Sequence, residues 1–145
     1  MKNKLYIAYG SNLNLRQMAG RCPNAVPVGT AMLKGWQLTF RGVATLDRVE
    51  GAIAPVGIWR ITKDCEKALD RYEGYPSLYR KEYLEIEHNG DKVEVMVYLM
   101  NNGLPCMPSK YYLETIAEGY EDIGLDTVHL TQALAYTKDR MSANK

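Results

Sequence analysis

A short segment near the N-terminus holds the first residues that could do chemistry. The apolar strand expected over residues 4–8 runs directly into Tyr9-Gly10-Ser11-Asn12-Leu13. Small residues between a strand and a helix leave several backbone N–H groups free to converge on one point, an arrangement that binds anions. The Ser11 and Asn12 side chains add donors that suit a carboxylate. The same segment also fits an ordinary strand-to-helix turn, in which Gly10 supplies a positive φ and Asn12 caps the helix; Asn14 is the other candidate for this cap.

Glu73 is the candidate group for proton transfer. It lies in the last turn of an expected helix that Thr62 caps, where the negative end of the helix dipole disfavours the charged carboxylate. Burial beside a neighbouring tyrosine would raise its pKa further, which tunes a glutamate for general acid/base catalysis. The alternative is that Glu66, Asp70 and Glu73 form a solvated acidic stripe at helical spacing.

Tyrosines are a third candidate group, because the chain has eleven Tyr against one Phe. A tyrosine ring packs while its hydroxyl reaches a hydrogen-bond partner, which suits a pocket for a polar ligand. Tyr79 begins a strand and Tyr112 lies three residues after Ser109, so either could direct a hydroxyl into a site. Both positions also fit a tyrosine that packs in the core, as Trp36 and Trp59 are expected to do.

The sequence lacks the motifs of several common kinds of active site. It has no GxGxxG, GxxxxGK[ST] or GxSxG motif. The two histidines, His88 and His129, stand apart from each other and from any Cys or carboxylate cluster with ligand spacing. We therefore expect neither a metal site nor a Ser-His-Asp relay.

The elements that must position these residues indicate an α+β fold. Strands are expected over residues 4–8, 26–33, 36–41, 52–61, 79–88 and 92–100, and helices over residues 15–19, 63–73, 110–118 and 127–139. Asn89-Gly90-Asp91 between two alternating apolar runs predicts a β-hairpin. Gly74 and Pro76 end the helix that carries Glu73. Pro55 predicts a sheet edge or a bulge within its strand.

Composition and charge describe a globular protein. Its 145 residues are 46% apolar and 24% charged, which is the balance of a single domain over residues 1–145. The net charge is +1 with both signs interspersed, so nucleic acid is not an expected partner. The widely spaced Cys22, Cys65 and Cys106 are expected to be reduced and mostly buried. No stretch approaches a membrane span or a signal peptide, so we expect no membrane association and a cytoplasmic location.

Four segments carry a resemblance to a known family. They are Tyr9-Gly10-Ser11-Asn12-Leu13, Gly57-Ile58-Trp59-Arg60-Ile61-Thr62, Leu69-Asp70-Arg71-Tyr72-Glu73-Gly74 and Pro108-Ser109-Lys110-Tyr111-Tyr112. In this order they are similar to the gamma-glutamylcyclotransferase-like family, which includes the avirulence-induced-gene-like proteins. The resemblance extends from the first strand to about residue 125. It implies an α+β fold built on a small mixed β-barrel with flanking short helices.

The resemblance also implies a substrate, a reaction and a set of site residues. The substrate is a small γ-glutamyl compound, and the reaction releases 5-oxoproline and a free amine without a cofactor or a metal. Glu73 takes the place of the family's acid/base. The substrate-binding residues implied are Tyr9, Gly10, Ser11, Asn12, Leu13, Tyr79 and Tyr112. Tyr111 competes with Tyr112 for the last of these positions.

Two alternative functions share this site. One is a γ-glutamylamine or isopeptide-type cyclotransferase, which differs only in the amine that leaves. The other is a non-catalytic module that binds a carboxylate metabolite. Contacts to the leaving group are expected in the loops over residues 41–51 and 101–107, where sequence does not separate the two cyclotransferases. Many relatives look dimeric, and the sequence leaves a homodimer open.

Overall fold

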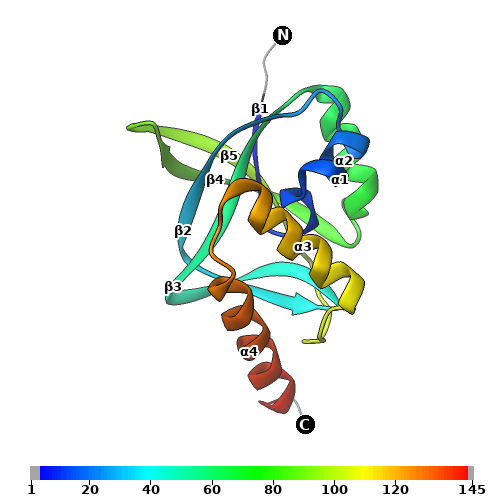
Figure 1. The fold of residues 1–145 in the computed structure, drawn as a ribbon, viewed down its shortest axis with the longest axis vertical. Coiled ribbons are helices and arrows are strands. Elements are labelled where there is room, and N and C mark those ends of the chain that lie inside the picture. The colour runs from blue at the N-terminus through cyan, green and yellow to red at the C-terminus, as the bar shows by residue number, and fades with distance from the viewer. Residues whose placement is uncertain (1–3, 144–145) are drawn as a thin grey trace.

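The computed structural model describes residues 4–143, which form a mixed five-stranded sheet with four α-helices around it (Figure 1). The strands are β1 (Lys4–Ala8), β2 (Val26–Arg41), β3 (Val43–Ile61), β4 (Tyr79–His88) and β5 (Asp91–Met100). The helices are the 3₁₀ turn η1 (Ser11–Leu13), α1 (Leu15–Arg21), α2 (Lys63–Glu73), α3 (Lys110–Ile123) and α4 (Val128–Ala143). The α+β class expected from the sequence is therefore confirmed.

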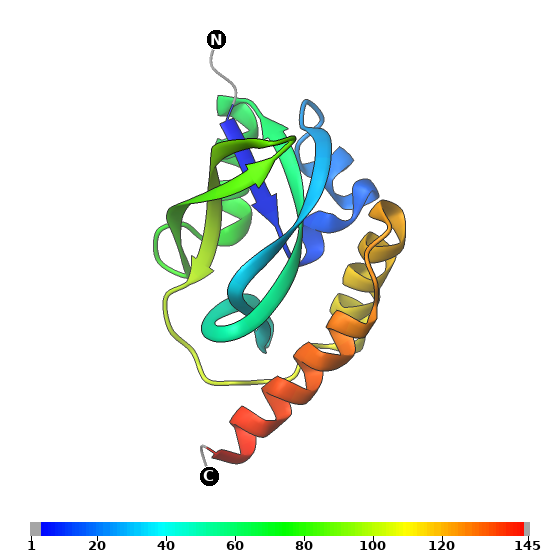
Figure 2. The same cartoon turned by 90° about the vertical axis from the view of Figure 1, so that its left-hand side faces the viewer.

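The sheet has the strand order β2-β3-β1-β5-β4. β1 pairs antiparallel with β3 and parallel with β5, and the two hairpins β2–β3 and β4–β5 complete the sheet on either side. The sheet curls strongly, but β2 and β4 remain its two edge strands (Figure 2). The small mixed barrel is thus an incompletely closed one.

The β2–β3 hairpin is longer and more continuous than its sequence indicates. We expected breaks at Lys34-Gly35 and over residues 47–51, but β2 and β3 run through both. The strands shift register between Lys34 and Trp36, where Gly35 has a φ of +86°. A bulge of this kind lets paired strands absorb unequal numbers of residues without ending. Turn-forming residues therefore marked a bulge where we expected a loop.

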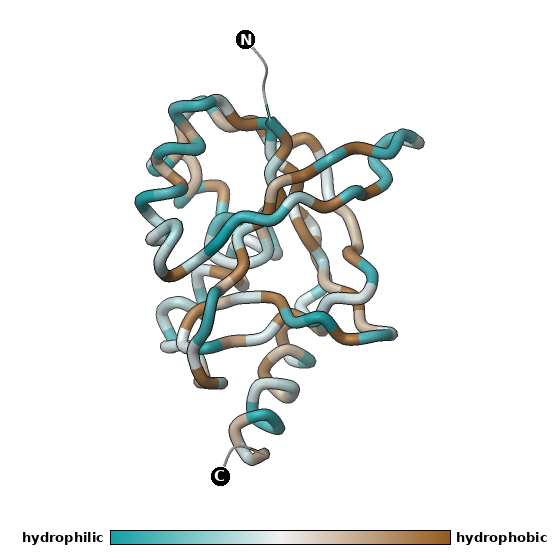
Figure 3. The backbone as a smooth tube through the Cα atoms, turned by 180° about the vertical axis from the view of Figure 1, so that it is seen from behind, coloured by the Kyte–Doolittle hydropathy of each residue, from teal (hydrophilic) through white to brown (hydrophobic). Residues whose placement is uncertain are grey.

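Two local predictions about the strands are confirmed. Asn89 and Gly90 have φ values of +53° and +82° and join β4 to β5, so the hairpin forms where the Asn-Gly pair predicts it. The tip of this hairpin is hydrophilic (Figure 3). Pro55 lies beyond Gly57, where the pairing of β1 with β3 ends, so β3 has a strand on only one side at the proline.

The helices lie around the sheet (Figure 1), and local signals set where they begin and end. Thr62 caps α2 by accepting a hydrogen bond from the Cys65 N–H at 3.2 Å. α3 continues past the expected residue 118 to Ile123, where Gly124 ends it in the left-handed region. α3 and α4 run along one side of the molecule (Figure 2). No helix within residues 4–143 combines the length and apolar character needed to cross a membrane.

The core lies between the curled sheet and the helices. Ile7, Phe40, Leu69, Val97 and Ile116 are fully buried there. Both tryptophans are buried, as predicted. Two of the three cysteines are buried, whereas Cys106 is exposed, and all three are free thiols.

Candidate active site

A cavity of about 210 Å³ lies where β1, the start of β3, the end of α2, the start of β4 and the first turn of α3 meet. Six of the eleven tyrosines line it: Tyr6, Tyr9, Tyr72, Tyr79, Tyr98 and Tyr112. The other lining residues are Gly10, Ser11, Asn12, Val43, Ala44, Glu73 and Leu78. Segments far apart in the sequence thus contribute to one site.

Gly10 begins the loop that forms one wall of the cavity. Its φ is −121°, so the positive φ considered for this glycine is wrong. A Cβ atom here would lie 3.1 Å from the Ala44 Cβ and 3.2 Å from the Tyr112 hydroxyl. The glycine is therefore needed because β3 and α3 approach the loop closely.

Asn12 is held by three hydrogen bonds. Its Nδ2 donates to the Tyr6 hydroxyl at 2.9 Å, its Oδ1 accepts from the Arg21 guanidinium, and its backbone carbonyl accepts from the Trp59 Nε1 at 3.1 Å. Asn14 caps α1 instead, because its Oδ1 accepts from the Gln17 N–H at 3.0 Å. The side chain of Asn12 is therefore fixed at the cavity wall and takes no part in capping.

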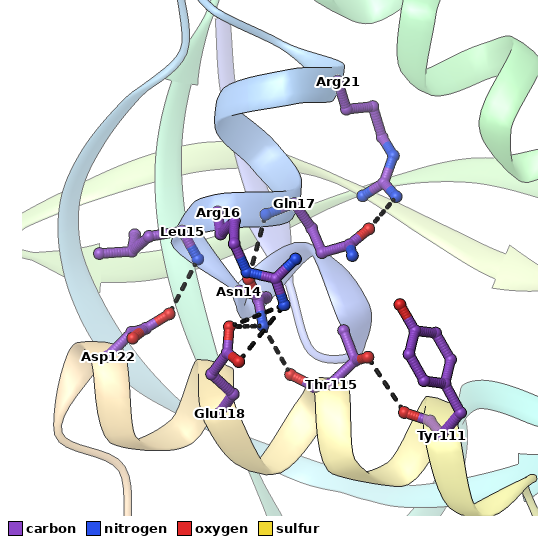
Figure 4. A network of polar contacts seen from close by, with 9 residues as sticks. All are labelled: Asn14, Leu15, Arg16, Gln17, Arg21, Tyr111, Thr115, Glu118 and Asp122. Atoms are coloured by element: carbon purple, nitrogen blue, oxygen red, sulfur yellow. Dashed lines mark hydrogen bonds and ion pairs between the residues drawn. The ribbon is translucent and has the colours of Figure 1, made fainter.

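A polar network ties α3 to the start of α1 (Figure 4). The Asn14 Nδ2 donates to the Thr115 carbonyl at 3.0 Å and to the Glu118 carboxylate at 2.7 Å. The Leu15 N–H donates to the Asp122 carboxylate at 3.0 Å. Gly119 allows this approach, since a Cβ there would lie 2.7 Å from the Asn14 backbone nitrogen. The network holds the middle and end of α3 against the loop and the start of α1, and the same helix carries Tyr112 in its first turn.

Glu73 occupies the last turn of α2, as predicted, and its carboxyl lines the cavity. Among the described residues, no hydrogen bond or ion pair reaches this carboxyl. Burial raises its pKa from 4.5 to about 7, although the Arg21 guanidinium opposes the shift. A carboxyl with this pKa is populated in both protonation states near neutral pH, which is what general acid/base catalysis requires.

The acidic stripe considered for α2 does not form as a solvated face. Glu66 pairs with Lys4 at 2.9 Å and with Lys81. Asp70 pairs with Lys81 at 2.9 Å and accepts a hydrogen bond from the Tyr98 hydroxyl at 2.6 Å. Glu73 thus differs from the other two acids of the stripe, because they are neutralised by lysines and it is not.

Ala44 binds two of the cavity tyrosines through its backbone. Its N–H donates to the Tyr112 hydroxyl at 3.0 Å, and its carbonyl accepts from the Tyr79 hydroxyl at 2.6 Å. Tyr111, the alternative to Tyr112, is 71% exposed and does not line the cavity. Of the two neighbouring tyrosines, α3 therefore brings only Tyr112 to the site.

Three cavity tyrosines, Tyr6, Tyr79 and Tyr112, stay protonated at neutral pH. Burial and then the nearby Glu73 raise the pKa values of Tyr6 and Tyr79 above their ordinary range. Burial also raises the pKa of Tyr112, which the Ala44 N–H opposes. These hydroxyls can donate and accept hydrogen bonds, but they are not bases at neutral pH.

The structure brings most of the predicted site residues together. Those that line the cavity are Tyr9, Gly10, Ser11, Asn12, Glu73, Tyr79 and Tyr112. Leu13 does not, because its side chain is fully buried in the core. Sequence reasoning did not predict the other lining residues, although the excess of tyrosine over phenylalanine signalled a polar, tyrosine-lined pocket. They are Tyr6, Val43, Ala44, Tyr72, Leu78 and Tyr98. Within residues 4–143, no group of three His, Cys, Asp or Glu side chains is placed to hold a metal ion.

Comparisons with known proteins agree with this geometry. The model of the family described as "Gamma-glutamyl cyclotransferase, AIG2-like" matches residues 6–119, a range that contains every residue lining the cavity. Gamma-glutamylcyclotransferase of Mus musculus is 31% identical over 138 residues, and that of Homo sapiens 30%. Each match covers 83% of this chain and 72% of the relative.

A solved structure named "Gamma-glutamyl cyclotransferase" superimposes with a TM-score of 0.77 and 25% identity, over 97% of this chain and 87% of the other. The fold, the sequence match and the tyrosine-lined cavity around Glu73 therefore agree. This chain belongs to the gamma-glutamyl cyclotransferase, AIG2-like family of enzymes.

Proposed function

We propose that this protein converts a γ-glutamyl amide into 5-oxoproline and a free amine, with Glu73 as the general acid/base. The observation that carries the proposal is the unpaired Glu73 carboxyl, which has a pKa of about 7 and lies in a small cavity beside the loop over residues 9–12. All three cysteines are free thiols, which fits the cytoplasmic location that we propose with it.

The substrate carries its own nucleophile. The α-amine attacks the γ-carbonyl carbon, a five-membered ring closes, and the amide C–N bond breaks. The α-ammonium gives up two protons, and the amine that leaves gains two, so the reaction consumes no other reactant. An enzyme for this step supplies a folded substrate, a proton relay and donors for the oxyanion, and it needs no cofactor.

Glu73 serves as the proton relay. As a carboxylate it takes a proton from the α-ammonium, and as a carboxylic acid it gives a proton to the departing nitrogen. A group that acts in both directions works best with a pKa near the working pH. Its pKa of about 7 meets this condition, whereas an exposed glutamate near 4.5 would be a poor acid at neutral pH.

The loop and the two tyrosines bind the ends of the glutamyl group. In the first turn of η1, the backbone N–H groups of Ser11 and Asn12 have no acceptor within the turn, and they suit the α-carboxylate or the oxyanion. Tyr112 accepts from the Ala44 N–H, so its own proton is free for the same anions. The Tyr79 hydroxyl donates its hydrogen bond to the Ala44 carbonyl, so the lone pairs of its oxygen can accept from the α-ammonium.

The decisive experiment measures 5-oxoproline by mass spectrometry. The substrates are γ-glutamyl dipeptides, glutathione and γ-glutamylamines, each with wild type, Glu73→Gln and Glu121→Gln. Glu121 is exposed on α3 and does not line the cavity, so its variant is a matched control. We expect product from wild type and Glu121→Gln, and a loss of at least about 1,000-fold in turnover for Glu73→Gln.

The same experiment separates the alternatives. Activity confined to γ-glutamylamines assigns the γ-glutamylamine type. Ligand-induced stabilisation without product from any compound identifies a binding module and refutes the catalytic proposal. A Glu73→Gln variant that keeps most of its turnover removes Glu73 as the acid/base.

A further inference from the structure

The residues that line the cavity fall into two groups, one buried and one exposed to solvent. The loop and the tyrosines at its interior are buried, with Tyr9 at 7%, Asn12 at 3% and Tyr79 at 4% of their surface exposed. Tyr72 and Leu78 also line the cavity but are 45% and 48% exposed. These two residues, with the partly exposed Val43, form the mouth of the cavity, which we call the rim.

The interior holds only a small group. The whole cavity, mouth included, has a volume of about 210 Å³, which is below the roughly 300–1,000 Å³ of pockets that enclose a drug-sized ligand. A glutamyl group that occupies this interior leaves its amide nitrogen near the mouth. The amine that departs must then lie against the rim, where Tyr72, Leu78 and Val43 contact it.

The rim offers hydrocarbon and no charge. Glu73 is the one charged residue among those that line the cavity. The Arg21 guanidinium stacks on the Tyr72 ring, 3.5 Å from its centroid, and donates to Asn12 and to Gln17. A carboxylate on the leaving group finds no free cation among the lining residues. An apolar group instead covers exposed hydrocarbon, which is favourable.

The rim is also held in place. The Leu78 N–H donates to the Gly74 carbonyl at 2.8 Å, and the Leu78 carbonyl accepts from the Asn101 N–H at 3.0 Å. The Asn101 side chain donates to the carbonyls of Pro76 and Ser77 at 2.8 and 2.9 Å. On the other side of the mouth, the Tyr72 and Ser11 hydroxyls share a hydrogen bond of 2.8 Å. An exposed leucine fixed at the mouth of a polar cavity is suited to select a ligand.

We propose that the preferred leaving amine carries an aliphatic or aromatic body and that Leu78 is the residue that selects it. This inference rests on the proposed function, since it assigns the half of the substrate that departs. It does not require the leaving group to carry a carboxylate.

The test uses three substrates of matched shape. γ-Glutamyl-leucine and γ-glutamyl-asparagine differ in polarity at nearly constant size, and γ-glutamyl-3-methylbutylamide is the leucine compound without its carboxylate. We expect kcat/KM to be about 10–100-fold higher for the leucine than for the asparagine compound, the range that apolar pocket contacts give. Removal of the carboxylate should change kcat/KM by less than about 3-fold, a change of well under 1 kcal/mol.

Leu78→Ser should reduce the leucine-to-asparagine ratio to within about 3-fold of unity, and the conservative Leu78→Met should keep most of it. Val128→Ser is the matched control, because Val128 is 45% exposed, close to Leu78, and does not line the cavity. It should leave the ratio unchanged. Circular dichroism of each variant shows whether it is folded.

The outcomes separate this inference from the proposed function. 5-Oxoproline from all three compounds at equal rates, or a ratio that Leu78→Ser leaves unchanged, overturns the inference but keeps the cyclotransferase. If nothing is turned over, the cyclotransferase fails, and the rise in melting temperature of Glu73→Gln with each compound decides the inference alone. A larger rise with the leucine than with the asparagine compound supports it, and equal rises refute it.

Discussion

Tyr79 and Tyr112 are bound to opposite ends of one residue. The Tyr79 hydroxyl donates to the Ala44 carbonyl at 2.6 Å, and the Ala44 N–H donates to the Tyr112 hydroxyl at 3.0 Å. Two hydroxyls of the same chemical type are thereby left with opposite capacities inside one cavity. Tyr112 keeps a proton to donate, whereas Tyr79 keeps lone pairs to accept.

Because Tyr112 keeps a proton to donate into the cavity, we expect Tyr112 and its exposed neighbour Tyr111 to contribute unequally to catalysis. Tyr112→Phe removes a donor to the substrate's anionic groups and leaves the Ala44 N–H without its acceptor. We expect kcat/KM to fall by about 10–100-fold, since a hydrogen bond to a charged group contributes roughly 1.5–3 kcal/mol. Tyr111→Phe is the control and should stay within about 2-fold of wild type, because Tyr111 is exposed. Steady-state kinetics that showed equal losses in both variants would contradict the assignment.

Gly10 predicts a site-specific effect of a single methyl group. In Gly10→Ala the new Cβ would lie 3.1 Å from the Ala44 Cβ and 3.2 Å from the Tyr112 hydroxyl, so the loop must shift by a few tenths of an ångström. We expect KM to rise by about 10-fold or more, because the binding groups on both sides move.

Gly20→Ala provides the matched control for Gly10→Ala. A Cβ at Gly20, within α1, meets nothing within 4 Å. This variant should keep wild-type kinetics and gain about 0.5–1 kcal/mol of stability from helix propensity. If Gly10→Ala binds substrate as well as Gly20→Ala does, the close approach of the loop to β3 and α3 has no part in binding.

Arg21 predicts a shift in the pH dependence of turnover. Its guanidinium lowers the pKa of Glu73, although burial wins and leaves that pKa at about 7. In Arg21→Met the opposing charge is gone, so the pKa of Glu73 rises further. Because the carboxylate is the form that accepts the first proton, the acidic limb of the kcat/KM profile should move to higher pH.

Two variants check this shift in the pH profile. Arg21→Lys should return the acidic limb part of the way to its wild-type position. Lysine keeps the positive charge but loses the flat stack on Tyr72. Arg60→Met, an exposed arginine of β3, should leave the profile in place. A purely structural role of Arg21 would lower kcat/KM equally at every pH.

Glu73 also predicts how stability depends on pH. Its folded pKa of about 7 lies above the ordinary value of 4.5, so the folded state holds its proton more tightly than the unfolded chain does. Stability from this group is therefore fully present below about pH 4.5 and is lost as the pH rises through 7. Glu73→Gln has no carboxyl to ionise, so its stability does not fall in this way as the pH rises.

Urea unfolding at several pH values measures the difference in free energy of unfolding between Glu73→Gln and wild type. Glu73→Gln should match wild type below pH 4.5 and exceed it above pH 7, by at most about 3 kcal/mol. Glu121→Gln is the control, because Glu121 is exposed and does not line the cavity. If the difference in free energy of unfolding between Glu73→Gln and wild type did not change with pH, the Glu73 carboxyl would not be buried in the cavity.

The sequence by itself determined the features that depend on neighbouring residues. The Asn89-Gly90 pair set the β4–β5 hairpin, and Thr62 with Gly74 set both ends of α2 and so the position of Glu73 in its last turn. Caps and turns are governed by the dihedral angles of a few adjacent residues, so a local pattern is enough to predict them. Two of the four family motifs, over residues 57–62 and 69–74, lie at the two ends of α2.

Only the tertiary structure decided which of these residues form the site. Nothing local distinguishes Tyr112 from Tyr111, or Glu73 from Glu66. The first pair is separated by how α3 docks on the loop, and the second by the lysines of β1 and β4 that reach Glu66. The unbroken β2–β3 hairpin likewise arises from cross-strand pairing, which overrides the turn-forming residues within it. Burial raises the pKa of Glu73, and the segments that bury it are distant in sequence. A local sequence pattern therefore cannot predict this pKa.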